Sequence, residues 1–200
     1  MKELLIATNN PGKFREYKEV FKQLKLPIKL TSLKELKIKE KVEETGKTFR
    51  ENAVIKARFF SKLSRLPTLA DDAGIEIDYL RGEPGVKSRR WLGYKLTDEE
   101  IINTALKKLE GVPKRKRSAR LKAVMGLIFP PNKKIYTFEV FLRGFIAEKP
   151  INKRVNGYPF RSIFIPLGKK KYLGQLGAVA HRKKAVEKSL PTIKKYLCLT

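Results

Sequence analysis

An α/β fold with a mixed, bent β-sheet is the architecture that this 200-residue sequence predicts. Strand-like and helix-like segments alternate through the first half of the chain, and two long extended segments follow each other in the second half. The sequence shows no internal repeat and no low-complexity linker. We therefore treat residues 1–200 as one domain, whose length suffices for a single core or for two lobes that share one.

The first half of the chain is typical of three short buried strands separated by two amphipathic helices. Apolar side chains recur at helical spacing after Pro11, which suits a first helical turn, and again after Thr45 or Thr48, either of which can cap a helix. An acidic turn at residues 71–72 would end the third strand, and residues 75–80 would resume the alternation beyond it. The expected elements are strands over residues 3–8, 28–30 and 68–70, with helices over 11–24 and 48–63.

The second half predicts a helix, a long hairpin, a short strand and a final helix. A turn rich in glycine and proline covers residues 82–85, and Thr97 with the three acids after it begins a helix that Gly111 would end. Pro191 would kink or divide the final helix. The expected elements are a helix over residues 97–110, paired strands over 118–129 and 133–146, a strand over 163–166 and a helix over 182–197.

The charge balance points to anionic partners. Lys and Arg number 46 against 20 Asp and Glu, so the net charge is +26, which attracts nucleotides, nucleic acid or anionic lipid without selecting among them. No apolar stretch is long enough for a membrane span, so we expect no membrane partner. A single cysteine, Cys198, and the absence of an apolar leader after Met1 favour a reducing compartment, and we expect a cytoplasmic protein.

The turn at residues 8–13 is a candidate anion site. A strand, a polar turn with a glycine and a helix start would bring backbone N–H groups and the positive end of a helix dipole to one place, where Lys13 adds a cation. The spacing is not that of a P-loop. A helix start capped by its own side chains explains the same residues.

Two acidic pairs are candidate metal ligands. Asp71 and Asp72 follow a predicted strand, and adjacent like charges need a cation or hydrogen bonds to compensate them. Hard carboxylate oxygens at a strand end suit Mg²⁺, which completes its shell with water and phosphate oxygens. Glu43 and Glu44 form a second pair in a lysine-rich segment, where a solvated loop is an equal explanation.

Two basic segments remain open from the residues alone. The single histidine, His181, precedes Arg182 at the start of the last helix, where the pair could contact a base or a phosphate, although a lone histidine is more often structural. The run over residues 114–117 could bind nucleic acid, but a charged connection before a strand is the favoured interpretation.

Several of these segments together resemble the inosine/xanthosine triphosphate pyrophosphatases, the ITPase family. The resemblance rests on residues 8–13, residues 43–53 with Lys56 and Ala57, residues 70–74 and residues 82–90. It is ordered from the first residues to the final helix and so covers nearly the whole chain.

The resemblance implies an ITPase-like fold, in which two lobes surround a central cleft. It also implies Mg²⁺-dependent hydrolysis of a nucleoside triphosphate to the monophosphate and pyrophosphate, by a homodimer that clears deaminated purines from the nucleotide pool. Asp72 would be the general base, Lys13 would stabilise charge on the departing pyrophosphate, and Asp72 would face Lys13. The implied metal residues are Glu43 or Glu44 and Asp72, and the implied substrate-binding residues are Thr8, Asn9, Asn10, Pro11, Gly12, Lys13, Ala73, Phe160, Arg161, His181 and Arg182.

The chain departs from the family pattern on the side that would hold the base. Arg161 stands where the family usually has an aspartate, which exchanges an acceptor for a donor, while Phe160 keeps an aromatic ring that could stack on a base. Ala73 and Ala180 replace serines, and the segment between Leu176 and Ala180 is shorter than usual and lacks a lysine. We therefore expect pyrophosphatase chemistry with altered or relaxed base choice.

Two alternatives stay open. One is a phosphatase of the same fold that acts on other modified nucleotides, such as those with methylated bases. The other is a protein that has lost catalysis and uses its basic surface to bind nucleotides or nucleic acid. Retention of both acidic pairs in so basic a chain favours the enzyme, because binding to a phosphate backbone gives carboxylates no role.

Overall fold

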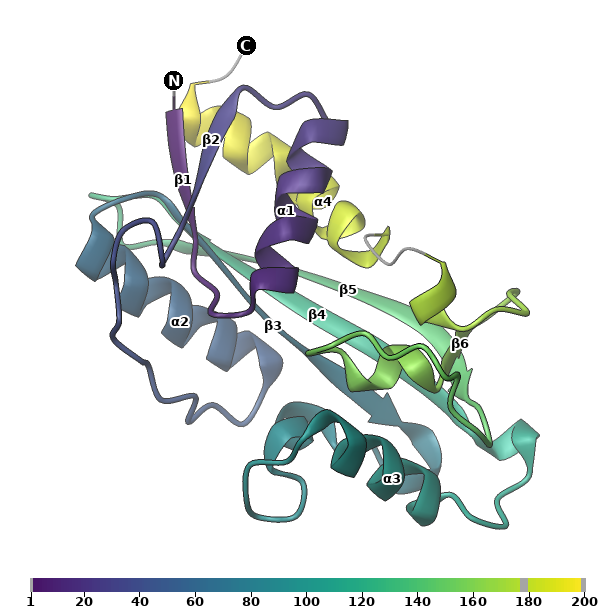
Figure 1. Ribbon diagram of the computed structural model, residues 1–200. Coiled ribbons are helices and arrows are strands. Elements are labelled where there is room, and N and C mark those ends of the chain that lie inside the picture. Colours follow the sequence, from purple (N-terminus) through teal and green to yellow (C-terminus); the bar gives the residue numbers. More distant parts are fainter. Residues whose placement is uncertain (1, 177–179, 199–200) are drawn as a thin grey trace. The chain divides into compact units, whose positions relative to one another are not determined.

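The computed structural model describes residues 2–176 and 180–198, which form the α/β arrangement of Figure 1. The predicted order of elements is confirmed. The strands are β1 (Lys2–Ile6), β2 (Ile28–Ser32), β3 (Thr68–Ile77), β4 (Ser118–Ile128), β5 (Ile135–Ile146) and β6 (Phe164–Pro166), and the helices are α1 (Pro11–Gln23), α2 (Phe49–Ser64), α3 (Asp98–Lys108) and α4 (Ala180–Leu197).

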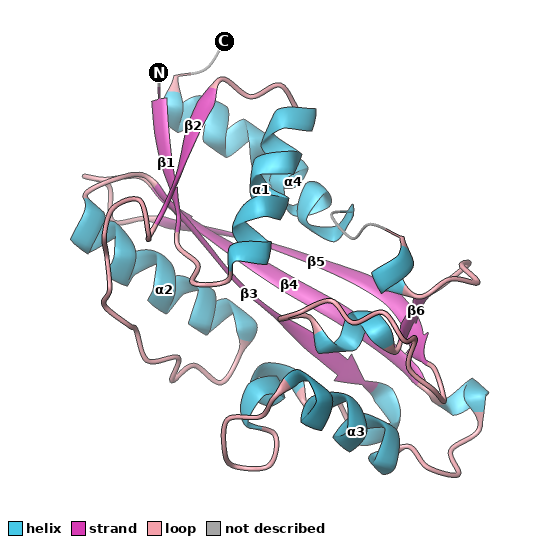
Figure 2. Ribbon diagram, viewed as in Figure 1, coloured by secondary structure: helices cyan, strands magenta, loops and turns pink. Residues whose placement is uncertain are grey.

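The strands form one six-stranded mixed sheet in the order β2-β1-β3-β4-β5-β6 (Figure 2). Strand β1 pairs in parallel with β2 and with β3, whereas β5 and β6 are antiparallel. The predicted mixed sheet is therefore confirmed. No helix in the described residues is both long enough and apolar enough to span a bilayer.

Contacts divide the chain into two compact units. Unit 1 comprises Met1–Asp72, Ala123–Val140 and Val179–Thr200, and unit 2 comprises Ala73–Lys122 and Phe141–Ala178. Strands β3, β4 and β5 are each shared between the units, since the boundaries after residues 72, 122 and 140 fall within them. The single domain expected from the sequence stays a prediction.

In unit 1, the apolar face of α2 packs against alternate residues of β1 and β3. Leu5 of β1, Ala7 just after that strand and Ala70 of β3 share a core cluster with Ala57 and Phe60 of the helix. Because side chains alternate across a strand, the residues between them lie on the opposite face of the sheet. Helices α1 and α4 contact each other in the same unit (Figure 1).

Unit 2 has its own core, built from α3 and the second half of β3. Ile75 and Ile77 of the strand are fully buried with Ile101 and Ile102 of the helix. Thr97 caps α3 as predicted, and it forms a reciprocal capping box with Glu100.

Two expectations about element boundaries are wrong. Asp71 and Asp72 do not end a strand: β3 continues through them to Ile77, because the alternating apolar residues beyond them keep the segment extended and buried. The acidic pair therefore lies in mid-strand, and its two side chains must point to opposite faces of the sheet. Nor does Pro191 divide the last helix, since α4 is continuous from Ala180 to Leu197.

The basic run over residues 114–117 separates into two parts. Lys114–Lys116 form an exposed 3₁₀ turn, as expected of a charged connection, but the side chain of Arg117 is buried in unit 2. Its guanidinium donates to the carbonyl oxygens of Leu109, Ile146 and Ala147 at 2.7–2.8 Å. Arg117 thus donates to three backbone acceptors, of which the Leu109 carbonyl also accepts from the Val112 N–H.

We expect Arg117→Gln to lower the free energy of unfolding by about 3 kcal/mol, because it leaves several buried carbonyl groups without donors. The control Lys116→Gln removes the same charge from an exposed neighbour and should change stability by less than about 0.5 kcal/mol. Urea denaturation at pH 7 measures both. Equal stability of the two variants would show that Arg117 has no structural role.

Candidate active site

The β1–α1 loop is a capped helix start. Asn10 Oδ1 accepts hydrogen bonds from the backbone N–H groups of Gly12 at 2.8 Å and Lys13 at 3.2 Å, and Pro11 has no N–H. Thr8 Oγ1 accepts from the Asn10 N–H at 3.1 Å. The first turn of α1 therefore uses two of its N–H groups on its own cap, and Lys13 brings the mobile cation of this loop.

Lys13 faces Asp71, not Asp72 as expected from the sequence. The Lys13 Nζ lies 3.1 Å from Asp71 Oδ2, and the Asp71 side chain is only 2% exposed. Arg182 Nη2 approaches the same oxygen at 3.4 Å from α4. Two cations from the two ends of the sequence therefore meet one carboxylate on the α1/α4 side of β3.

These cations keep Asp71 ionised. Burial alone would raise the pKa of Asp71, but the charges of Lys13 and Arg182, with that of Lys56, lower it well below its usual range. Burial lowers the pKa of Lys13, and the charge of Asp71 opposes this effect. Asp71 Oδ1 has no hydrogen-bond partner among the described residues, so cationic charge is what stabilises the carboxylate here.

His181 and Arg182 belong to the same network in the first turn of α4. Both residues are buried, and Arg182 Nη1 lies 3.3 Å from His181 Nε2 while it also pairs with Glu16 of α1. The structure thus brings His181 and Arg182 to Lys13 through Asp71, whereas the resemblance assigned Lys13 to the triphosphate and the other two residues to the base pocket.

On the opposite face of the sheet, Asp72 meets the first half of α2. Lys56 Nζ lies 3.1 Å from Asp72 Oδ1 and 3.1 Å from Glu44 Oε2. Asn52 Nδ2 donates to Asp72 Oδ2 at 3.2 Å. Asn52 and Lys56 are one helical turn apart, so one face of α2 presents an amide and an ammonium to the carboxylate.

Asn52 also holds the acidic loop in place. Its Oδ1 accepts from the Gly46 N–H at 2.8 Å, and a Cβ on Gly46 would lie 2.6 Å from that oxygen. No side chain fits at this position, so glycine permits the close approach. Two residues before it, Glu44 is positioned to reach Lys56.

Asp72 differs from Asp71 in the direction of its pKa shift. Burial raises the pKa of Asp72, and the opposing charges of Lys56 and Lys13 do not cancel that effect. Burial would lower the pKa of Lys56, but the charges of Asp72 and Glu44 outweigh it, so that this pKa is raised. Lys13 therefore acts on Asp72 by its charge at a distance, although its ion pair is with Asp71.

The carboxylates of Glu44 and Asp72 fit a divalent cation in kind and in placement. Their oxygens approach the same Lys56 nitrogen from two segments of chain, so two hard ligands converge on one positive charge. Both glutamates of the predicted pair are exposed, but only Glu44 forms an ion pair with Lys56 among the described contacts. The described residues contain no cluster of three or more such ligands, and other ligands would come from water or substrate.

Asn9 is exposed in the β1–α1 loop, and the other predicted residues lie in unit 2. Ala73 follows Asp72 within β3, and Phe160 and Arg161 lie in a buried 3₁₀ turn, where Phe160 packs in the core and the Arg161 guanidinium lies 3.6 Å from the Tyr158 ring centroid. Most of the shortened segment before Ala180, residues 177–179, is outside the described residues.

Sequence reasoning missed the roles of Asn52, Lys56 and Asp71. Asn52 and Lys56 could have been identified because they are four residues apart, follow an acidic segment and belong to the residues on which the family resemblance rests. The signal for Asp71 was the alternation that Ile75 and Ile77 resume, which implies an unbroken strand.

Comparison with known proteins shows the family of the chain. The model of the Ham1 family matches residues 4–192. The chain is 37% identical to the dITP/XTP pyrophosphatase of Bacillus subtilis over 193 residues, which cover 94% of this chain and 95% of the relative, and it is 37% identical to that of Bacillus licheniformis, with 94% and 96% covered. Among solved structures, a HAM1 protein from Coxiella burnetii superposes with a TM-score of 0.79 at 33% identity and covers 98% of this chain and 100% of its own. The resemblance predicted from the motifs is confirmed.

We expect Asp71→Asn to lower the free energy of unfolding at pH 7 by about 3 kcal/mol, because it leaves the buried Lys13 without its anion and removes one of the two acids that pair with Arg182. The control Glu40→Gln neutralises an exposed acid and should change it by less than about 0.5 kcal/mol. Urea denaturation measures both. If Asp71→Asn is as stable as the control, the ion pairs of Asp71 do not stabilise the fold.

The stability of Asp71→Asn and of its control Glu40→Gln should also depend differently on pH in the acid range. The pKa of Asp71 is lower in the folded state than in the unfolded chain, so its contribution is complete above about pH 4 and is lost as pH falls through the folded value. Between pH 5 and pH 2, the stability of Asp71→Asn should therefore decline less steeply than that of the unmodified protein or of Glu40→Gln. Parallel curves would rule out the depressed pKa.

Proposed function

The chain belongs to the Ham1 family, and on this basis we propose that it hydrolyses nucleoside triphosphates, deaminated purine nucleotides among them, to the monophosphate and pyrophosphate. Such an enzyme would remove damaged nucleotides from the cellular pool. Mg²⁺ dependence, a homodimer and a cytoplasmic location belong to the same proposal, and the sequence resemblance supports them.

The observation that carries the proposal is the setting of Asp72. This carboxylate has a raised pKa, accepts a hydrogen bond from Asn52 and faces the ammonium of Lys56, with the Glu44 carboxylate on the same cation. A base is most effective when its pKa approaches the working pH, so burial shifts Asp72 in the useful direction. A carboxylate with only a structural role gains nothing from that shift.

Each residue would have a distinct task. Asp72 would accept a proton from the attacking water, and Asn52 would orient its carboxylate. Lys56 and Lys13 would stabilise the negative charge of the phosphate groups, with Lys13 held in place by Asp71. Mg²⁺ bound by Glu44 and Asp72 would neutralise phosphate charge and lower the pKa of water.

Base selection would rest on residues of unit 2. Arg161 can donate hydrogen bonds but cannot accept them, so it cannot replace the aspartate that the family pattern has at this position. Phe160 and Arg161 are both buried, which supports a packing role in addition to any contact with the base. We propose that the preference among bases is weaker than in the relatives.

A nucleic-acid-binding protein without catalysis remains the competing function. The net charge of +26 supports it. The paired arrangement of Asp72 and Glu44 supports the enzyme, because it would repel a phosphate backbone in the absence of a cation.

We expect Asp72→Asn to lower kcat on inosine triphosphate by about 10³-fold, the usual contribution of a general base, with little loss of stability. Pyrophosphate release is the readout, with orthophosphate measured in parallel. In the unmodified protein, the acid limb of the kcat/KM profile should lie above the ordinary aspartate pKa of about 3.9, because the pKa of Asp72 is raised. An unchanged rate in a folded variant removes Asp72 from the mechanism.

A second test compares bases. We expect kcat/KM for inosine, xanthosine, guanosine and uridine triphosphates to fall within about tenfold, because a site that has exchanged an acceptor for a donor loses the discrimination of a hydrogen-bonded pocket. The Bacillus subtilis relative, assayed in the same way, is the control. A strong preference for the deaminated purines in this protein would refute the interpretation of Arg161.

A further inference from the structure

A basic pocket lies on the side of α2 that faces away from Asp72. It has a volume of about 750 Å³ and lies between the second half of α2 and the β4–β5 connection, which Figure 1 shows beside the end of the helix. All of its lining residues belong to unit 1, and they are Arg58, Ser61, Lys62, Arg65, Ile128, Pro130, Pro131, Asn132 and Lys133.

Helical geometry separates this pocket from the candidate active site. Arg58 and Lys62 are four residues apart and so lie on one face of α2, and Arg65 follows as the C-cap of the helix. Lys56 is two residues before Arg58, which at about 100° per residue places it on the far side of the helix. The pocket therefore does not share its cations with Asp72.

The charge of the pocket is uncompensated. Arg58, Lys62, Arg65 and Lys133 line it, and none of their side chains forms an ion pair or hydrogen bond with a residue that the structure describes. No acidic residue is among the described residues that line it. Four like charges around one hollow repel one another, and an anion would relieve that repulsion.

The helix dipole does not account for this cluster. The C-terminal end of α2 carries about half a negative charge, which favours one or two nearby cations such as Lys62 and Arg65. Four positive charges exceed that half charge several-fold, so a net positive potential remains.

The wall of the pocket is apolar. Ile128, Pro130 and Pro131 form it, while Ser61 and Asn132 add polar groups that can donate hydrogen bonds. Its volume lies within the usual range of small-molecule sites, about 300–1,000 Å³. An apolar wall with a cationic rim fits a ligand that has a planar base or sugar attached to phosphate groups.

We propose that this pocket binds the phosphate groups of a polyanion, either a short stretch of single-stranded nucleic acid or a free polyphosphate compound. The site is independent of the hydrolysis proposed above. A polyanion site gives a role to the net charge of +26, which the candidate active site does not account for.

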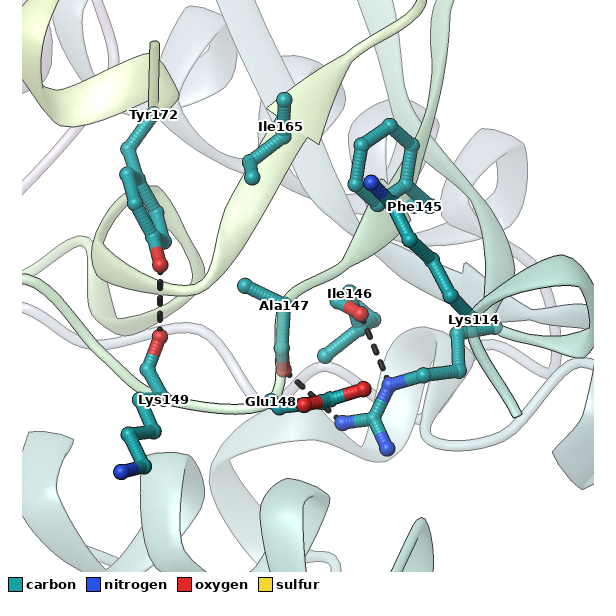
Figure 3. Close-up of a pocket in the computed structure, with 9 residues that line it drawn as sticks. Lys114, Phe145, Ile146, Ala147, Glu148, Lys149, Ile165 and Tyr172 are labelled. Carbon is teal, nitrogen blue, oxygen red and sulfur yellow. Dashed lines mark hydrogen bonds between the residues drawn. The ribbon is translucent and has the colours of Figure 1, made fainter. Parts of the chain in front are cut away.

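A hollow in unit 2 provides the contrast (Figure 3). It has a volume of about 330 Å³, and Lys114 and Lys149 are among its lining residues. Its three cations are partly compensated, because Glu148 lies among them, Arg117 donates to backbone carbonyl groups, and the Lys114 ammonium lies 5.1 Å from the Phe145 ring centroid. An anion has less to gain there.

The test is fluorescence anisotropy with a labelled twelve-residue oligothymidylate in EDTA, so that magnesium-dependent binding of nucleotide does not contribute. The test variant carries Arg58→Gln, Lys62→Gln and Arg65→Gln. The control carries Lys114→Gln, Arg115→Gln and Lys116→Gln, so each variant lowers the net charge of +26 by three.

We expect the test variant to raise Kd about tenfold or more and to reduce the slope of log Kd against log salt by about 2, because each lost phosphate contact contributes about 0.7 for a single strand. The control should change Kd by less than about threefold. Equal changes in the two variants would mean that only overall charge matters, and that result would overturn the proposal. The proposal would also be overturned if the unmodified protein bound neither the oligothymidylate nor inorganic tripolyphosphate.

Displacement by inorganic tripolyphosphate distinguishes the two sources of phosphate. Displacement at equal phosphate concentration identifies a free polyphosphate compound, and displacement only in large excess identifies a nucleic-acid strand. Either result supports the site if the test variant weakens binding. Hydrolysis of inosine triphosphate should be the same in both variants, so failure of this proposal and failure of the proposed function can be told apart.

Discussion

The structure depends on the alternation of side chains along β3. Two adjacent aspartates in one strand cannot share a face, so Asp71 and Asp72 each need compensation of their own. Lys13 and Arg182 provide it on one side of the sheet, and Lys56 provides it on the other. Helices from both ends of unit 1 are thereby tied to the same short segment of strand.

Much of the fold could be predicted from periodicity and caps. The start of α1 at Pro11, the cap of α2 at Thr48 and the capping box of α3 all follow from local rules, and the structure has them within a residue or two. The end of the third strand could not be predicted, because the polar pair at 71–72 resembles a turn until the buried residues after it are considered. Pairing of β3 in the interior of the sheet overrides that local preference.

Several residues of the candidate site could be identified from the sequence, but which cation pairs with which carboxylate could not. The residues of the β1–α1 loop, Asp72, His181 and Arg182 were identified from their motifs. Which cation meets which carboxylate depends on the face of each element, and a motif does not specify faces. In the structure Lys13 forms an ion pair with Asp71. Lys56, to which the motif assigned no role, forms an ion pair with Asp72.

The two aspartates differ because their surroundings differ in the balance of burial and charge. Both are shielded from water, which raises a carboxyl pKa, but Asp71 has two cations at one oxygen and its pKa falls, whereas Asp72 shares Lys56 with Glu44 and its pKa rises. Two titratable groups whose environments drive their pKa values apart are suited to different tasks. A carboxylate that stays ionised can hold cations in position, and one with a raised pKa can exchange a proton. Burial that is opposed by only one contacting cation, which Glu44 shares, is therefore what makes Asp72, rather than its neighbour, the better proton acceptor.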